Sequence, residues 1–191
     1  MVKALFKFSK IPQDVVVVDT TSSSGKWRGL SPFVLDARRY GSKNFENLWQ
    51  YSKVYPEFLD GDGSVARGKW EEWRYSGFTS EKAYRYPMGK GRIPCFSLWN
   101  GEKLGYVEAR KKIYIPIYME LVAETDSFKQ LEQIYHNSQV SIEHPDLILL
   151  DYDAYDHIAL GMTLRDVANN PSKKCGHAFV LLSMLTGEPI L

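Results

Sequence analysis

Short runs of β-branched and aromatic residues open the chain and alternate with turn residues. Ala4 to Phe8 and Val15 to Asp19 are two such runs, and Ile11-Pro12-Gln13 separates them. Strands favour these side chains, and proline interrupts them. The pattern predicts two strands and a turn, and Thr20 to Gly25 then has the composition of an exposed loop.

The first strong helix signal follows Asn44, a residue that commonly caps helix N-termini. Phe45 to Val54 contains no glycine or proline, so the sequence predicts a helix there that ends before Pro56. By contrast, Phe58 to Pro94 has many glycines and arginines and little sustained period. We expect loops and short helices in that stretch.

The longest helical pattern begins at Asn100 or Gly101, and its apolar positions recur at helical spacing from Leu104 to Leu121. Pro116 lies inside it and cannot donate to the carbonyl of Lys112, so a kink or break is expected. A further helix is predicted from about Ser127 to His136.

Near the C-terminus, Leu147 to Leu150 has the length and apolar character of a buried strand. Asp151, Asp153 and Asp156 follow its end. Thr163-Leu164-Arg165-Asp166 resembles a capping box, and Lys173 to Leu185 predicts a buried final helix that Gly187 and Pro189 terminate.

These elements predict an α+β protein, mostly helical with a small β-sheet. The chain has 191 residues, of which 44% are hydrophobic, so one compact domain over residues 1–191 is expected. A net charge of +1 excludes a global field that would attract nucleic acid or a membrane. Cys95 and Cys175 are expected to be thiols, and the apolar runs are too short for a bilayer. No secretory leader is evident, so we expect a soluble, cytoplasmic protein.

Three polar side chains fall into one row on the first predicted helix. At about 100° per residue, Glu46, Gln50 and Lys53 share a face that borders the apolar positions Phe45 and Trp49. A carboxylate, an amide and an ammonium can converge on a ligand with hydroxyls and a phosphate. The alternative is a solvated face, which charged helix rows often form.

Glu46, Gln50 and Lys53, preceded by Leu30-Ser31-Pro32-Phe33, resemble the hallmark of the NADAR superfamily of N-glycoside hydrolases. The order of later features is also similar: Gly91-Arg92, then Trp99 ahead of a long helix, then Asp153-Ala154-Tyr155. The resemblance covers residues 30–185.

The chain departs from the family pattern around the presumed pocket. Pro32 replaces an asparagine, Asn47 replaces a histidine, Asp156-His157 replaces Trp-Gly, and Cys175 stands near a family asparagine. These changes leave substrate identity and catalysis open.

The resemblance implies hydrolysis of an N-glycosidic bond in an ADP-ribosylated or phosphoribosylated base, free or within nucleic acid. The transition state resembles an oxocarbenium ion, which needs negative charge beside the ribose and a base for water. Glu46 is the first candidate for this role, and Asp153 is the second carboxylate. Lys53 would hold a phosphate or protonate the departing base, and Gln50 would orient the sugar.

Other residues are candidates for substrate binding. Trp99 and Tyr155 have flat faces that could stack on a base, although either could belong to the core. Arg92 lies in a flexible Gly-Lys-Gly-Arg run suited to a phosphate. Arg110 could snorkel past the core or point into the cleft, and Asp156 and His157 would lie near the pocket.

Alternatives from other classes stay open. Asp151, Asp153, Asp156 and His157 could form a hard-cation site, but they lack the spacing of known calcium or zinc motifs, so no metal and no cofactor are predicted. A non-catalytic nucleotide or ADP-ribose sensor would use the same cleft. A nucleic-acid-binding accessory protein would use the basic clusters, which are Arg38-Arg39, Arg110 to Lys112 and Lys173-Lys174.

Overall fold

The computed structural model describes residues 1–140 and 145–191, and this part of the chain is α+β. It divides into two compact units. Unit 1 contains Met1–Ser31 and Ile115–Leu191, and unit 2 contains Pro32–Tyr114. The expectation of a single domain stays a prediction.

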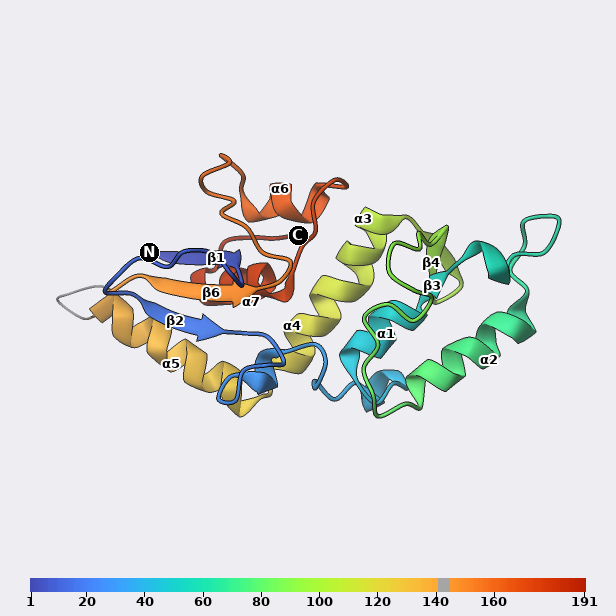
Figure 1. The fold of residues 1–191 in the computed structure, drawn as a ribbon, viewed down its shortest axis with the longest axis horizontal. Coiled ribbons are helices and arrows are strands. Elements are labelled where there is room, and N and C mark those ends of the chain that lie inside the picture. Colours follow the sequence, from blue (N-terminus) through green and yellow to red (C-terminus); the bar gives the residue numbers. More distant parts are fainter. Residues whose placement is uncertain (141–144) are drawn as a thin grey trace. The chain divides into compact units, whose positions relative to one another are not determined.

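Unit 1 contains a three-stranded parallel sheet with β6 (Leu147–Asp151) between β1 (Val2–Phe6) and β2 (Val16–Asp19) (Figure 1). The register aligns Val2 and Val16 with Leu147. All five residues of β6 are buried, as expected of a central parallel strand. The two predicted N-terminal strands therefore exist, but each pairs with β6 and not with the other.

Helices complete unit 1: η1 (Arg28–Leu30), α4 (Ile115–Ala123), α5 (Asp126–Val140), α6 (Leu164–Asn169) and α7 (His177–Thr186). The apolar α7 packs against β1 and β6. The predicted capping box of α6 is confirmed, because the Asp166 amide donates to Thr163 Oγ1 and the Asp166 carboxylate accepts from the Thr163 amide. The left-handed Gly187 terminates α7 as predicted, but α7 starts at His177 and not at Lys173.

Unit 2 contains α1 (Phe45–Tyr51), α2 (Arg67–Phe78), α3 (Tyr106–Ala109) and the short helices η2 (Arg38–Tyr40), η3 (Pro56–Phe58) and η4 (Arg110–Tyr114). Its antiparallel sheet has the order β3 (Lys53–Val54), β4 (Phe96–Trp99) and β5 (Glu102–Leu104). A core cluster beside this sheet contains Val54, Tyr55, Phe58, Trp70 and Leu98.

Sheet pairing corrects two helix predictions in unit 2. The first helix ends at Tyr51, because Lys53 and Val54 pair with β4. The long helix begins at Tyr106 and not near Asn100, because Glu102–Leu104 pairs with β4 as well. In both places, pairing with strand β4 overrides the local helical pattern.

The predicted irregularity near Pro116 is confirmed. The five residues before α4 form a π-helical turn, η4, and Pro116 is the second residue of α4. Proline has no N–H to donate to the Lys112 carbonyl, so regular α-helical bonding cannot continue through this point.

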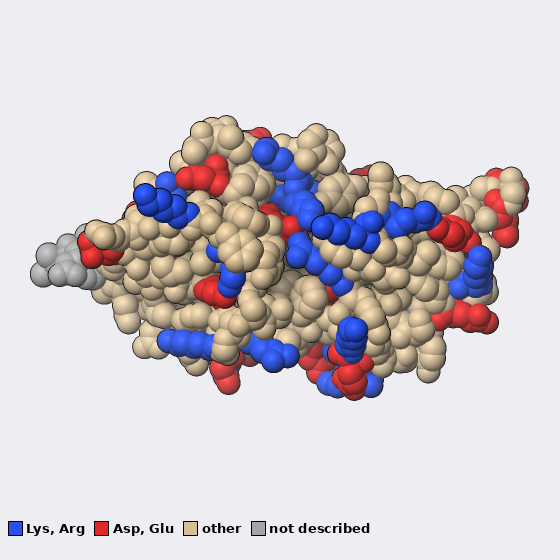
Figure 2. Space-filling view, in the orientation of Figure 1, with Lys and Arg blue, Asp and Glu red and all other residues tan. Residues whose placement is uncertain are grey.

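Lys, Arg, Asp and Glu side chains are interspersed on the face that Figure 2 shows. This distribution agrees with the small net charge of +1. Within residues 1–140 and 145–191, every helix is too short or too polar to cross a bilayer.

Candidate functional site

Helix α1 positions the predicted polar row in unit 2. Asn44 is its N-cap, and the Asn44 side chain accepts a hydrogen bond of 2.9 Å from the Asn47 amide. All seven residues of α1 are buried. Because Glu46 is 6% and Gln50 is 8% exposed, the alternative of a solvated face is wrong for these two residues.

The three side chains of the row are joined by hydrogen bonds. Lys53 Nζ donates to Gln50 Oε1 at 2.6 Å, and Gln50 Nε2 donates to Glu46 Oε1 at 2.8 Å. The amide of Gln50 thus connects the ammonium to the carboxylate. Lys53 lies in β3 and not in the helix, so the strand that shortens α1 also carries the cation of the row.

Three aromatic side chains pack together beside the row. The rings of Phe45 and Trp49 contact the ring of Tyr114, with centroids 5.3 and 5.2 Å apart. Lys53 Nζ lies 4.8 Å from the centroid of the Trp49 ring. The Lys53 ammonium thus contacts both the face of the Trp49 indole and the Gln50 amide, which connects it to the Glu46 carboxylate. Neither Trp49 nor Tyr114 was predicted as a site residue.

Arg110 is the predicted site residue with the deepest burial in unit 2. It begins η4 and is 2% exposed, so it does not snorkel to solvent. Its guanidinium lies over the Tyr106 ring, 4.5 Å from the centroid. A buried guanidinium is costly unless nearby groups compensate its charge.

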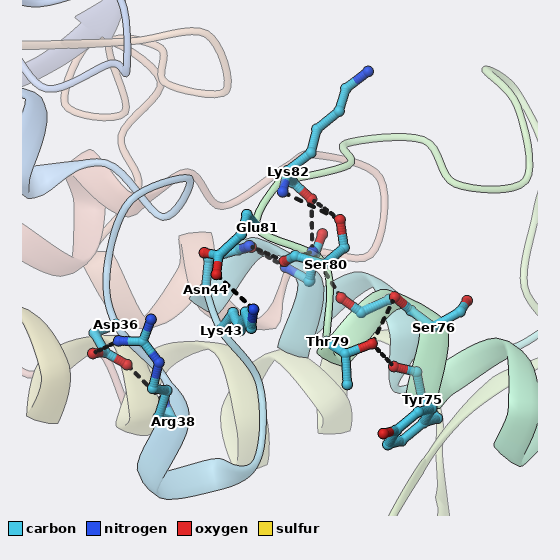
Figure 3. A network of polar contacts seen from close by, with 12 residues as sticks. Asp36, Arg38, Lys43, Asn44, Tyr75, Ser76, Thr79, Ser80, Glu81 and Lys82 are labelled. Atoms are coloured by element: carbon cyan, nitrogen blue, oxygen red, sulfur yellow. Dashed lines mark hydrogen bonds and ion pairs between the residues drawn. The ribbon is translucent and has the colours of Figure 1, made fainter.

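Asn47, a departure from the family pattern, has a structural role. Its Nδ2 donates to the carbonyls of Gly77 and Lys82 at 2.9 and 2.8 Å, and its Oδ1 accepts from the Tyr84 amide at 2.9 Å. Asn44 adds a bond to the Ser80 carbonyl, and Figure 3 shows this part of the network. The helix that carries Glu46 therefore also holds the loop that follows α2.

The two other predicted site residues of unit 2 lie outside the row. The Arg92 guanidinium pairs with the Glu57 carboxylate of η3. Trp99 ends β4, opposite Glu102 of β5.

The remaining predicted site residues belong to unit 1 and follow β6. Asp153 pairs with Lys174 Nζ at 2.9 Å. The Tyr155 ring contacts Phe179 of α7, with centroids 4.9 Å apart, and Lys173 Nζ lies 4.9 Å from its centroid. Asp156 pairs with Lys3 at 3.4 Å.

His157 is buried against the edge of the Phe179 ring, with centroids 5.5 Å apart. Burial lowers the pKa of His157, although Glu188 and Asp156 act in the opposite direction. Its Nδ1 is buried and has no hydrogen-bond partner among the described residues. The neutral form of the imidazole is therefore favoured here.

Unit 1 contains a buried polar cluster of its own, which was not predicted. His177 Nδ1 lies 3.1 Å from Asp151 Oδ2, and His177 Nε2 lies 2.8 Å from Thr20 Oγ1 and 2.9 Å from the Thr20 carbonyl. The cluster links the ends of β6 and β2 to the first residue of α7.

The pKa values of this cluster indicate an ion pair. Burial acts to lower the pKa of His177, but the Asp151 carboxylate beside it raises the pKa above the usual 6.5. Burial acts to raise the pKa of Asp151, but the charge of His177 and its hydrogen bonds lower it below 3.8.

The order aspartate, histidine, threonine matches that of a nucleophilic triad, but the geometry favours a structural role. Thr20 is fully buried, and its hydroxyl donates to the Leu150 carbonyl at 2.8 Å. The Thr20 carbonyl can only accept a hydrogen bond, so His177 Nε2 donates to it and cannot act as the base that a nucleophile requires. The cluster therefore fastens α7 to the sheet.

The acidic residues after β6 do not converge as a metal site would require. Asp151 contacts His177, Asp153 contacts Lys174, and Asp156 contacts Lys3. In the part of the chain that the structure describes, no three His, Cys, Asp or Glu side chains form a metal-binding group.

The structure thus joins Glu46, Gln50 and Lys53 in one hydrogen-bonded row, while Arg92 and Trp99 have other neighbours in the same unit. Comparisons with family models, curated proteins and solved structures give no match for this chain. The NADAR resemblance therefore stays a prediction.

Proposed function

We propose that this protein is a hydrolase that cleaves the N-glycosidic bond of an ADP-ribosylated or phosphoribosylated base. The observation that supports the proposal is the buried row of Glu46, Gln50 and Lys53 beside the Trp49 ring. These are the residues on which the family resemblance depends. Burial lowers the dielectric constant around the carboxylate and strengthens its electrostatic effect on a nearby cationic centre.

The proposed reaction assigns one role to each member of the row. The Glu46 carboxylate stabilises positive charge on the ribose and takes a proton from the attacking water. The water oxygen bonds to the anomeric carbon while the bond from that carbon to the base nitrogen breaks. The departing base takes up a proton, from Lys53 or from solvent.

Gln50 and Lys53 prepare the site for this chemistry. The hydrogen bond from Gln50 Nε2 fixes Glu46 Oε1, so the carboxylate is oriented before the substrate arrives. Lys53 is half-buried over the Trp49 ring, where it can bind a substrate phosphate while its stem stays packed. Arg110, buried over Tyr106, is a second cation for the same substrate.

Asp153 and Tyr155 belong to unit 1, where Asp153 pairs with Lys174 and Tyr155 packs on Phe179. Their roles as second carboxylate and base-stacking residue stay predictions from the family resemblance. The same holds for Trp99, Arg92, Asp156 and His157 as substrate contacts.

A discontinuous mass-spectrometric assay tests the proposal. Purified protein is offered DNA with ADP-ribosylated guanine, ADP-ribose derivatives and phosphoribosylated pyrimidines. We expect release of base or ADP-ribose from one of these substrates, with the rate about 10²- to 10⁴-fold lower in Glu46→Gln. The matched control is Glu72→Gln, an exposed glutamate of α2 in the same unit. Binding without turnover would instead identify a nucleotide sensor. The absence of both binding and turnover would contradict the proposal.

A further inference from the structure

One segment of unit 2 combines positive charge with exposed aromatic surface. Residues 82–92 contain Lys82, Arg85, Lys90 and Arg92, two tyrosines and no acidic residue. Lys82 and Lys90 are exposed, and Tyr86 is 45% exposed. Glu46, Gln50 and Lys53 of the proposed reaction lie outside this segment, and Arg92 is the one predicted substrate contact within it.

The cations of this region lie close to its rings. Lys82 Nζ is 5.2 Å from the centroid of the Tyr84 ring, and the Arg85 guanidinium is 5.6 Å from that of Tyr86. On the neighbouring sheet, Lys103 Nζ is 4.9 Å from the Phe96 centroid. Interleaved cations and rings are typical of surfaces that bind phosphates and stack on bases.

The carboxylate that precedes the segment pairs with a lysine outside it, since Lys43 Nζ lies 2.5 Å from Glu81. Within the segment, Arg92 pairs with the Glu57 carboxylate. The charge that the segment offers a ligand therefore comes from the exposed Lys82 and Lys90.

The backbone presents these side chains in a fixed arrangement. The hydrogen bonds from Asn47 hold Lys82 and Tyr84, and Figure 3 shows the Lys82 side chain pointing away from the polar network. The Gly89 amide donates to the Tyr86 carbonyl at 3.0 Å, which closes a turn. Gly89 and Gly91 have left-handed φ values of 98° and 86°, so the turns on both sides of Lys90 require glycine.

We propose that residues 82–92 form a binding surface for single-stranded nucleic acid, with little dependence on sequence. Lys82 and Lys90 would contact phosphates, and the Tyr86 ring would stack on a base. A single strand fits better than a duplex, because a ring at the protein surface needs a base face that is not already stacked. The proposal goes beyond the hydrolase, since it concerns strands that carry no ADP-ribose.

Fluorescence anisotropy tests this surface with unmodified, labelled oligothymidylate and oligouridylate of about 12 nucleotides, within the usual site size. For Lys82→Gln/Lys90→Gln, the slope of log K against log salt should become shallower by about 1.4, since each lost phosphate contact contributes about 0.7. For Tyr86→Ala, affinity should fall about tenfold or more, and the salt slope should not change.

Matched controls make the test specific. Lys10→Gln/Lys129→Gln removes two exposed lysines of unit 1, and Tyr75→Ala removes a tyrosine of α2 that is 71% exposed. Both control variants should bind as the natural chain does.

Absence of binding, or equal losses in the controls, would overturn the proposal. The proposal would also be overturned if polyglutamate bound as tightly as the oligonucleotides and Tyr86→Ala had no effect on oligonucleotide affinity. Charge alone would then explain the binding. Since the probes contain no N-glycosidic ADP-ribose, the outcome does not depend on the hydrolase proposal.

Discussion

Both units bury a carboxylate, but the cations that balance the two carboxylates are placed differently. In unit 1, Asp151 lies 3.1 Å from the ring of His177, and both residues are buried. In unit 2, the amide of Gln50 connects the Glu46 carboxylate to Lys53, which is half-buried over Trp49. The first arrangement is closed within the core. The second brings its cation to a place that a ligand can reach.

This difference separates a structural role from a reactive one. A buried pair whose members satisfy each other stabilises the fold but offers nothing to a substrate. A row that ends in an accessible cation can exchange its internal contacts for contacts with a substrate. The comparison therefore predicts that substitutions in unit 1 lower stability, whereas substitutions in the row lower activity.

The largest expected effect on stability is that of His177→Ala. The substitution leaves the Asp151 carboxylate buried beside a cavity, and the free energy of unfolding should fall by about 3–5 kcal/mol. Urea denaturation followed by circular dichroism measures this change. His136→Ala, at an exposed position of α5, is the control and should stay within about 0.5 kcal/mol of the natural chain. Equal effects of the two variants would contradict the structural role of the pair.

Gly176→Ala should break the same cluster by overpacking. An added methyl group would collide with the Asp151 carboxylate and press on the backbone of Asp153. We expect a loss of about 1–3 kcal/mol, measured as a lower melting temperature. At Gly25 nothing lies within 4 Å of an added methyl group, so Gly25→Ala should change the melting temperature little.

In unit 2, Asn47→Ala should loosen the loop that follows α2 and leave Glu46 in place. The carbonyls of Gly77 and Lys82 and the Tyr84 amide would each lose a partner. An unsatisfied buried polar group costs about 1–3 kcal/mol, and water can reach part of this loop. We therefore expect the free energy of unfolding to fall by about 2 kcal/mol. Hydrogen exchange at the Tyr84 amide should become faster, whereas unchanged exchange would contradict this role for Asn47.

The smallest expected effect is the pH dependence of the unit 1 pair. The pKa of His177 is raised above 6.5, so its contribution is complete below that pH and is lost as the pH rises through the folded-state pKa. The pKa of Asp151 is lowered below 3.8, so its contribution is complete above that pH and is lost as the pH falls. The pair should therefore stabilise the fold most between these two values.

Urea titrations across the pH range measure this dependence, whose slope for one proton is at most about 1.4 kcal/mol per pH unit. The slope above the usual pKa of His177 should be absent in His177→Ala. A natural chain that becomes more stable as the pH rises through this range would contradict the assigned protonation states.

Features that depend on neighbouring residues were predicted well from the sequence. The cap at Asn44, the capping box at Thr163 and the buried strand after Leu147 each have a short-range cause in side-chain type and spacing. The row of Glu46, Gln50 and Lys53 was also found from helical spacing, although Lys53 belongs to a strand. The resemblance that gave the row its chemistry stays a prediction.

Features that depend on distant residues were missed. The end of α1 is set by pairing with β4, more than 40 residues further along the chain. Helix α2, with 12 residues, lies in a stretch for which loops and short helices were predicted. The Thr20–His177 contact joins residues 157 positions apart, so no local sequence pattern predicts the contact itself. An aspartate at the end of a buried strand and a histidine at the start of a buried helix were the only available indications.

The most direct test of the central claim is to measure turnover and unfolding free energy together for Glu46→Gln. The account predicts that turnover falls about 10²- to 10⁴-fold while stability stays within about 1 kcal/mol, because the amide keeps the shape of the side chain and loses only its charge. A loss of several kcal/mol with turnover per folded molecule unchanged would contradict it, and would assign Glu46 the structural role that Asp151 has in unit 1.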